Sequence, residues 1–153
     1  MGHLRLTDHV NAAIDHVWDM NVSCDRLPQW NVNIVEIKDC PGGRLDRVGA
    51  KATTVGRVMG RNIEGHSETL RADKPHTFVQ KLTGAGGATA TINATFAEAG
   101  GGTDVVVEAD YDFPMGFFGG IADKLLGGSI KRDIEHSMAN FRELCEATAP
   151  ARV

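Results

Sequence analysis

Apolar and polar residues alternate in seven stretches of the chain, and this alternation is typical of strands with one buried and one solvated face. The first stretch is Leu4–Val10. Six more follow, at Val32–Lys38, Ala50–Val58, Asn62–Ala72, His76–Thr83, Ala88–Glu98 and Thr103–Phe113. Turns rich in glycine or containing proline separate these six, so we expect consecutive antiparallel hairpins.

The last two stretches show the alternation most clearly. One face of the final stretch carries Val105, Val107, Ala109, Tyr111 and Phe113, while the other is mostly acidic. The corresponding face of the preceding stretch carries Ala88, Ala90, Ile92, Ala94 and Phe96. We expect both apolar faces to be buried on the same side of a sheet. Their many alanines leave little side-chain volume to fill the space above them.

Helical periodicity appears near the start of the chain. The segment Ala12–Met20 places Ile14, Val17 and Trp18 on one face. Asn11 is in position to cap this helix. Ser23 and Asp25 are in position to cap a short second helix, which we expect to follow directly.

A longer helix is predicted after the last strand and ends near Ala147. Its apolar residues recur every three or four positions. They are Leu126, Ile130, Ile134, Met138, Phe141 and Cys145. Lys131–Glu135 and Arg142–Glu146 are expected as ion pairs on the solvated side. Gly127 and Gly128 weaken the start by about 1 kcal/mol each relative to alanine, which favours a break or bend there.

These elements predict an α+β fold in which a curved, seven-stranded antiparallel sheet grips the long C-terminal helix. The apolar face of the sheet must be covered, and only this helix is long enough to cover it. The two short helices would close one end. We expect residues 1–148 to form a single ligand-binding domain, a usual size for one domain, and residues 149–153 to be a frayed tail.

A strongly curved sheet does not touch a straight helix along its whole length, so large side chains would have to fill the gap. The chain has 2 Trp, 1 Tyr and 6 Phe. These are too few to fill the volume, so we favour a ligand cavity over a solid core. In a solid core the space would be closed by Phe78, Phe96, Phe113, Phe141 and Met138.

Composition and charge narrow the function classes. The formal net charge is −4, and lysine and arginine do not cluster into a basic stripe, so nucleic acid is not expected as a partner. We expect neither a signal segment nor stable membrane insertion. Cys24, Cys40 and Cys145 form no CxxC motif, and we expect them reduced and buried in a cytoplasmic protein. A homodimer is only the base-rate expectation.

Candidate chemistry is sparse. Glu64, His66 and Glu68 share one face of a predicted strand, where the histidine would have a raised pKa and act as an acid or base. We favour a solvated face for them, and no fourth ligand at suitable spacing supports a metal site. Tyr111 lies on an apolar face, where it would orient a ligand or bond to the backbone. Thr54 and Gln80 are further polar candidates for the pocket.

Several segments together resemble the START/Bet v 1-like superfamily, in its polyketide cyclase/dehydrase and lipid-transport group. They are Val17-Trp18, Pro28-Gln29-Trp30, Gly102–Val105, Phe113–Gly116 and the terminal helix, and they span about residues 3–147. The resemblance implies a helix-grip fold with an apolar pocket between sheet and helix. Phe113–Gly120 would then gate this pocket or form an ordinary corner.

We therefore expect the protein to bind a hydrophobic small molecule such as a lipid, polyketide or quinone, with no cofactor. One alternative is a polyketide cyclase/dehydrase-like enzyme that uses Tyr111 and His66 for proton transfer. Another is a regulatory or protein-interaction module. The residues expected to bind the ligand are Trp18, Trp30, Phe78, Phe96, Tyr111, Phe113, Phe117, Ile130, Ile134 and Met138.

Overall fold

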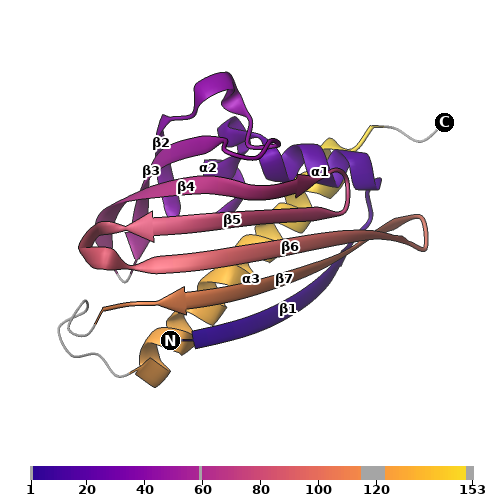
Figure 1. Cartoon of the computed structure of the whole chain (residues 1–153). Helices are drawn as coiled ribbons and strands as arrows, with labels where there is room; N and C mark the ends of the chain where they lie inside the picture. Colours follow the sequence, from indigo (N-terminus) through magenta and orange to yellow (C-terminus); the bar gives the residue numbers. More distant parts are fainter. Residues whose placement is uncertain (1, 59, 115–122, 151–153) are drawn as a thin grey trace.

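A computed structural model gives the fold and describes residues 2–58, 60–114 and 123–150. In these residues, seven strands form one antiparallel sheet in the order β1-β7-β6-β5-β4-β3-β2 (Figure 1). The strands are β1 (Gly2–Val10), β2 (Ile34–Asp39), β3 (Lys51–Val58), β4 (Arg61–Asp73), β5 (Thr77–Gly84), β6 (Thr89–Ala99) and β7 (Gly102–Asp112). The helices are α1 (Ile14–Val22), α2 (Leu27–Trp30) and α3 (Asp123–Thr148), with 3-10 turns at Cys24–Arg26, Pro41–Gly43 and Ala85–Gly87.

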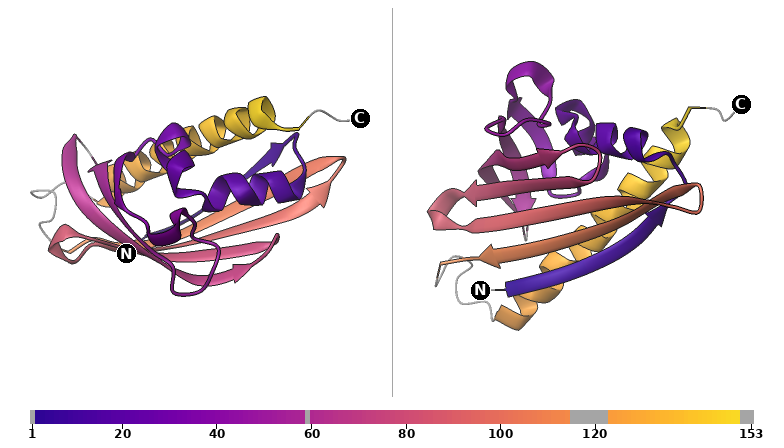
Figure 2. Two further views of the ribbon diagram at one scale, coloured as in Figure 1. Left: turned by 90° about the horizontal axis from the view of Figure 1, so that it is seen from above. Right: turned by 45° about the vertical axis from the view of Figure 1, so that its right-hand side comes forward.

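The sheet curves around α3, and α1 and α2 lie across one end of the same face (Figure 2). This is the predicted α+β helix-grip architecture, with the predicted strands in the predicted order. The curvature is aided by register shifts between β2 and β3 and between β4 and β5. At Gly56 in β3 a side chain would lie 2.8 Å from the Asn33 carbonyl oxygen, so only glycine allows this close approach.

Trp18 is the centre of the core beneath α1. Its side chain is fully buried and meets the rings of Phe78 and Phe96 edge-on, at centroid distances of 5.9 and 6.2 Å. The indole Nε1 of Trp18 is buried without a hydrogen-bond partner among the described residues, whereas the buried hydroxyl of Thr103 is paired. The Thr103 hydroxyl donates to the Ala12 carbonyl oxygen at 2.8 Å, which fixes the entry to α1 against β7.

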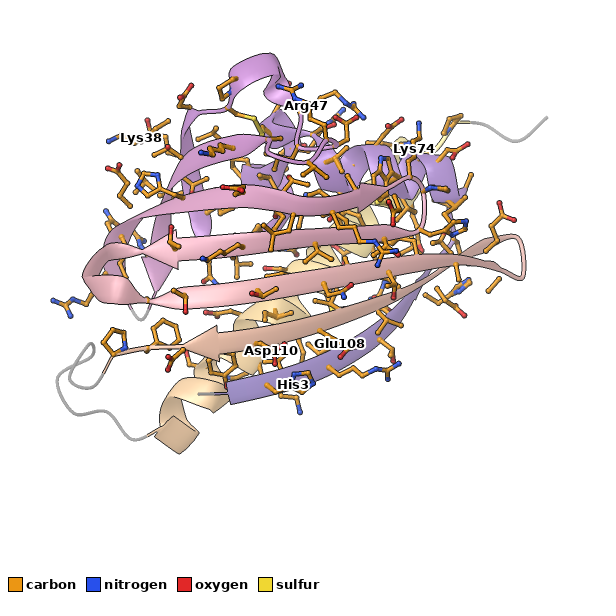
Figure 3. All side chains as sticks on the ribbon, viewed as in Figure 1. His3, Lys38, Arg47, Lys74, Glu108 and Asp110 are labelled. Carbon is orange, nitrogen blue, oxygen red and sulfur yellow. A yellow bond between two sulfur atoms is a disulfide. The ribbon has the colours of Figure 1, made fainter. Side chains whose placement is uncertain are left out.

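The outer face of β1 and β7 is polar and paired across the strands. His3 lies beside Glu108 and Asp110 (Figure 3). Its Nδ1 is 2.6 Å from Asp110 Oδ1. Because β1 is an edge strand, these charged side chains also discourage edge-to-edge pairing with another sheet.

Helix α3 runs continuously through Gly127 and Gly128, so the predicted break is wrong. The Lys131–Glu135 pair is present, with Nζ 3.8 Å from Oε1. The predicted Arg142–Glu146 pair is replaced by longer-range contacts. Arg142 donates to both carboxylate oxygens of Asp8 at 2.8 and 2.9 Å. Glu146 accepts a hydrogen bond from the Asn11 backbone.

The predicted caps of the first helices are wrong. Helix α1 begins after Ala13, and no side-chain hydrogen bond caps it. Asn11 instead meets Glu146 of α3, because β1 continues to Val10 before the chain turns. The Ser23 hydroxyl donates back to the Asp19 carbonyl oxygen at 2.6 Å, so it closes α1 rather than starting the next helix.

The cysteines also differ from expectation. Cys24 and Cys40 are joined by a disulfide that ties the start of the 3-10 turn before α2 to the end of β2. The expectation of three reduced thiols is therefore wrong, and disulfides persist mainly outside a reducing cytoplasm. The cytoplasmic location stays a prediction. Cys145 is free and buried as predicted, and burial raises the pKa of its thiol to about 12.

Candidate ligand-binding site

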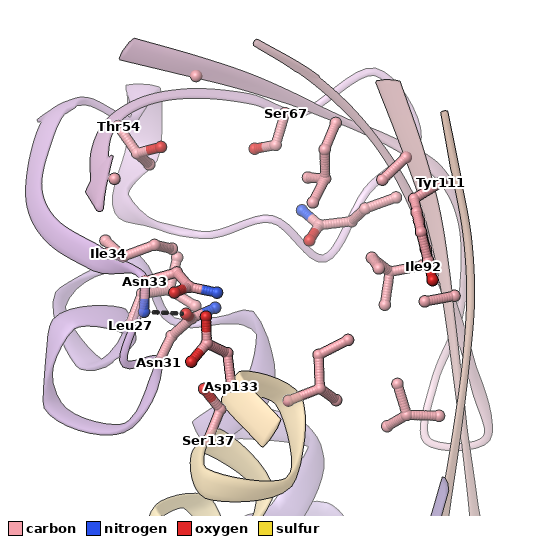
Figure 4. A pocket seen from close by; sticks show the side chains of 18 of the residues that line it. Leu27, Asn31, Asn33, Ile34, Thr54, Ser67, Ile92, Tyr111, Asp133 and Ser137 are labelled. Carbon is pink, nitrogen blue, oxygen red and sulfur yellow. Dashed lines mark hydrogen bonds between the residues drawn. The ribbon is translucent and has the colours of Figure 1, made fainter. Parts of the chain in front are cut away.

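A cavity of about 360 Å³ lies between the concave face of the sheet and α3 (Figure 4). Its walls come from β3 to β7, from the α1–β2 region and from one face of α3. The volume falls in the range of small-molecule sites, which are mostly apolar with a few placed polar groups. The cavity predicted from the curved sheet and the shortage of large side chains is therefore present.

The cavity is open because small side chains line the concave face of the sheet. Ala88, Ala90 and Ala94 of β6 and its approach, together with Ala109 of β7, line the cavity where larger residues would fill it. The same alternation that places these alanines inward places charged and hydroxyl side chains outward. Opposite them, Ile130, Ile134 and Met138 face the cavity from α3, each one turn from the next.

The predicted ligand residues that the structure describes line the cavity with one exception. The lining members are Trp30, Phe78, Phe96, Tyr111, Phe113, Ile130, Ile134 and Met138. Trp18 is the exception, since it lies behind the cavity wall and packs against Phe78 and Phe96. Phe117 and most of the proposed gate, residues 115–120, lie outside the described residues, as does the side chain of Leu126.

His66 borders the cavity through its place in β4, but its side chain points outward and is 58% exposed. Its Nδ1 lies 3.2 Å from the Thr53 hydroxyl, and its Nε2 lies 3.8 Å from a Glu64 carboxylate oxygen. Glu64 in turn contacts Lys38. The carboxylate and histidine row thus belongs to the outer face, the alternative we favoured. Among the described residues, no group of three His, Cys, Asp or Glu side chains is arranged to hold a metal ion.

A polar cluster forms the rim of the cavity beside α3. Figure 4 shows Asn31, Asn33, Asp133 and Ser137 close together there. The Asn33 amide nitrogen, in the orientation that pairs both its ends, donates to Asp133 Oδ2 at 3.0 Å and to the Arg57 carbonyl oxygen at 2.9 Å. The Ser137 hydroxyl accepts a hydrogen bond from the Val32 backbone at 3.0 Å. Asp133 is the one carboxylate among the described lining residues.

Buried donors without partners are the second polar feature. Trp30 Nε1, Asn21 Nδ2 and Gln80 Nε2 belong to side chains that line the cavity, and none has a hydrogen-bond partner within the protein. Leaving a buried donor unpaired costs about 1–3 kcal/mol, so proteins seldom do so without a reason. All three atoms are N–H donors, which a ligand with acceptor oxygens would satisfy.

Sequence reasoning found the apolar wall but missed most of this polar set. Gln80 and Thr54 were predicted as polar candidates, and both line the cavity. Asp133 and Ser137 were missed, although they lie three and seven residues after Ile130 and thus on the same helical face. That spacing is the signal that would have found them. Asn21 and Asn33 depend on the packing of α1 and β2 and carry no such signal.

Comparison with family models gives the family of the chain, and comparison with solved structures supports its fold. A family model described as polyketide cyclase/dehydrase and lipid transport matches residues 1–146. Comparison with curated protein sequences gives no match. No helix within the described ranges is both long enough and apolar enough to cross a membrane.

Solved structures with this fold share little sequence with the chain. A protein from Rhodobacter sphaeroides is 18% identical with a TM-score of 0.72, covering 95% of this chain and 93% of that one. The structure of Ara h 8.0201 is 12% identical with a TM-score of 0.70, covering 96% and 99%. DynU16, a protein from the dynemicin biosynthetic locus, is 15% identical with a TM-score of 0.68, covering 99% of this chain and 49% of that one.

Proposed function

Because the chain belongs to the polyketide cyclase/dehydrase and lipid transport family, we propose that it binds a hydrophobic small molecule in the cavity between its sheet and α3. The observation that carries this proposal is the cavity itself, about 360 Å³ in volume and walled mainly by apolar side chains. A hydrophobic molecule bound against this lining is removed from water and packs against apolar side chains, which favours binding.

Apolar burial supplies most of the affinity in this proposal. At about 25 cal/mol per Å², burying roughly 300 Å² of ligand surface contributes about 7.5 kcal/mol. Part of this is offset by the ligand's lost freedom of motion. The lining alanines keep the space open, while Trp30 and Phe141 hold the rim with their edge-on contact at 4.9 Å. The polar groups then set the orientation of the bound molecule.

Native mass spectrometry of the protein from its source cell tests this proposal. We expect a noncovalent adduct that dissociates under mild activation, and an Ala90→Trp variant that carries no adduct because the indole fills the cavity. The matched variant is Ala97→Trp, which places the same side chain on the exposed outer face of the same strand. Bare protein in every preparation would count against the proposal.

A cyclase-like enzyme is the second candidate, and one observation favours it. Tyr111 and Asp133 lie on different walls of the same cavity (Figure 4). In an aldol cyclisation, the Asp133 carboxylate would remove a proton from a carbon between two carbonyls. That carbon would bond to another carbonyl carbon of the same chain, and Tyr111 would protonate its oxygen. The version that uses His66 is weaker, since the His66 side chain points away from the cavity.

The Tyr111→Phe variant distinguishes the enzyme function from the carrier function. In an enzyme this change abolishes turnover of a poly-β-ketone while binding persists. In a carrier it alters binding only. The third alternative, a regulatory or interaction module, gains no specific observation. In the described part, the exposed large apolar residues are Val35, Val48 and Leu70, on three separate segments, and scattered exposure of this kind is ordinary.

A further inference from the structure

The chemistry of the cavity wall narrows the class of ligand, an inference that rests on the proposed binding function. Gln80 is the central feature. It lies on β5, the middle strand of the sheet, where it pairs with Ile92 of β6 on one side and Thr69 of β4 on the other. Its neighbours on the inward face, Phe78 and Leu82, are apolar and also line the cavity. On the inward face of β5, a single amide therefore lies between apolar side chains.

The Nε2 atom of this amide is buried and has no hydrogen-bond partner among the described residues. A leucine of similar size would fit the pattern of the strand without leaving a buried donor unpaired. A polar group kept in such a place is explained when a bound molecule supplies its partner.

Two more unpaired donors belong to side chains of α1 and α2 that line the cavity. Trp30 Nε1 and Asn21 Nδ2 are both buried without partners, and their side chains also line the cavity. An indole N–H only donates and never accepts. The complementary ligand therefore presents acceptor oxygens at more than one position, as carbonyl groups do.

The charge of the wall sets a second condition. Asp133 is the one carboxylate among the described lining residues, and these residues include no lysine or arginine. A fatty-acid carboxylate would enter this apolar space without a cation to pair with and would be repelled by Asp133. Burying such a charge unpaired is strongly unfavourable. An anionic lipid is therefore a poor fit.

We propose that the cavity selects an uncharged hydrophobic molecule that carries carbonyl oxygens, and that Gln80 recognises one of these oxygens. The cavity rejects fatty acids of comparable size. Trp30 and Asn21 provide further unpaired donors, so a molecule with more than one carbonyl fits better than one with a single carbonyl.

Competitive displacement of the neutral fluorescent probe N-phenyl-1-naphthylamine tests this selectivity. The competitors are 9,10-anthraquinone, anthracene, which has the same ring skeleton without carbonyls, and laurate, which is an anion. For the wild-type protein we expect anthraquinone to bind at least about tenfold more tightly than anthracene, because only the quinone pairs the buried donors. Laurate should bind most weakly.

Three variants assign the effect to residues. Gln80→Leu should weaken anthraquinone binding about tenfold and leave anthracene binding within about twofold, which also shows that the cavity is intact. Lys81→Leu is a matched change at the exposed neighbouring position and should alter neither anthraquinone binding nor anthracene binding. Asp133→Asn should strengthen laurate binding, because it removes the like charge.

The outcomes separate this inference from the function on which it rests. Equal binding of anthraquinone and anthracene by the wild type overturns the inference and leaves hydrophobic binding in place. The inference is also overturned if Gln80→Leu weakens the binding of anthraquinone and of anthracene equally. It is likewise overturned if the wild-type protein binds laurate more tightly than anthraquinone. If neither the fluorescent probe nor any competitor binds, the proposed function and the inference both fail.

Discussion

The ring of Trp30 meets the ring of Phe141 edge-on, with centroids 4.9 Å apart and planes inclined at 74°. This contact joins α2 to α3 at the rim of the cavity. Two hydrogen bonds from the same stretch of α3 support it. Ser137 accepts from the Val32 backbone, and Asn140 donates to the Trp30 carbonyl oxygen. One stretch of α3 thus positions both the rim and part of the wall.

Replacing Phe141 with alanine should destabilise the fold by about 3 kcal/mol, because Phe141 is only 6% exposed and its loss enlarges an existing void. Urea unfolding followed by circular dichroism gives this free energy. Val48→Ala is the control, since Val48 is 70% exposed and should change stability by less than about 0.5 kcal/mol. A loss below about 1 kcal/mol for Phe141→Ala would contradict the proposed packing.

Thiol titration should distinguish the three cysteines. The native protein should react slowly or not at all with Ellman's reagent, because Cys145 is buried, its pKa is raised to about 12, and the reactive species is the thiolate. Unfolding without a reductant should expose this one thiol. Unfolding with a reductant should expose two more, from the Cys24–Cys40 bond.

The control for the thiol count is Cys145→Ala, which should show no reactive thiol until a reductant is added. Three thiols in the unfolded wild-type protein without a reductant would mean that Cys24 and Cys40 are not joined. Fast reaction of the native protein would instead place Cys145 at the surface.

Stability should depend on pH through His9 on the outer face of β1. Its Nδ1 lies 2.7 Å from Asp104 Oδ1, and this hydrogen bond raises the pKa of His9 above the ordinary 6.5. The nearby Asp8 and Asn11 raise it further, and desolvation lowers it by less than the Asp104 bond raises it. A histidine with a raised folded-state pKa stabilises the fold below its unfolded pKa. That contribution disappears as the pH rises through the folded pKa.

Asp104→Asn should therefore lower the urea midpoint more at pH 5.5 than at pH 8.5. Glu98→Gln, which removes a carboxylate from the exposed end of β6, is the control and should show no such difference between the two pH values. If the decrease in urea midpoint caused by Asp104→Asn stays constant or grows as the pH rises, the His9–Asp104 pair does not stabilise the fold through the protonated histidine.

The sheet and the long helix were predictable because their signals are local. Alternation fixes which face of each strand is buried, so the inward alanines Ala90, Ala94 and Ala109 were found without coordinates. Glu64 and His66 were placed on the outer face by the same pattern. Helix caps and disulfides depend instead on contacts between distant segments. Neither the Asn11 contact with Glu146 nor the Cys24–Cys40 bond can be derived from residue spacing.

The polar part of the site was less predictable for a related reason. Asp133 borders the apolar stripe of α3, and a charged residue in that position looks solvated when the sequence is considered alone. Only the packing of α2 against α3 brings Asn33, in the turn between α2 and β2, within hydrogen-bond distance of it. Gln80 was recognisable as polar, but that its Nε2 is buried without a partner is a property of the whole cavity.

The central claim is that the cavity between the sheet and α3 is a ligand-binding site. Direct titration of the protein with N-phenyl-1-naphthylamine, followed by its fluorescence, tests this claim most directly. We predict saturable enhancement for the wild type and for Ala97→Trp, and at least about tenfold weaker binding for Ala90→Trp, whose indole occupies the cavity. Equal binding by wild type and Ala90→Trp, or no saturable binding by the wild type, would contradict it.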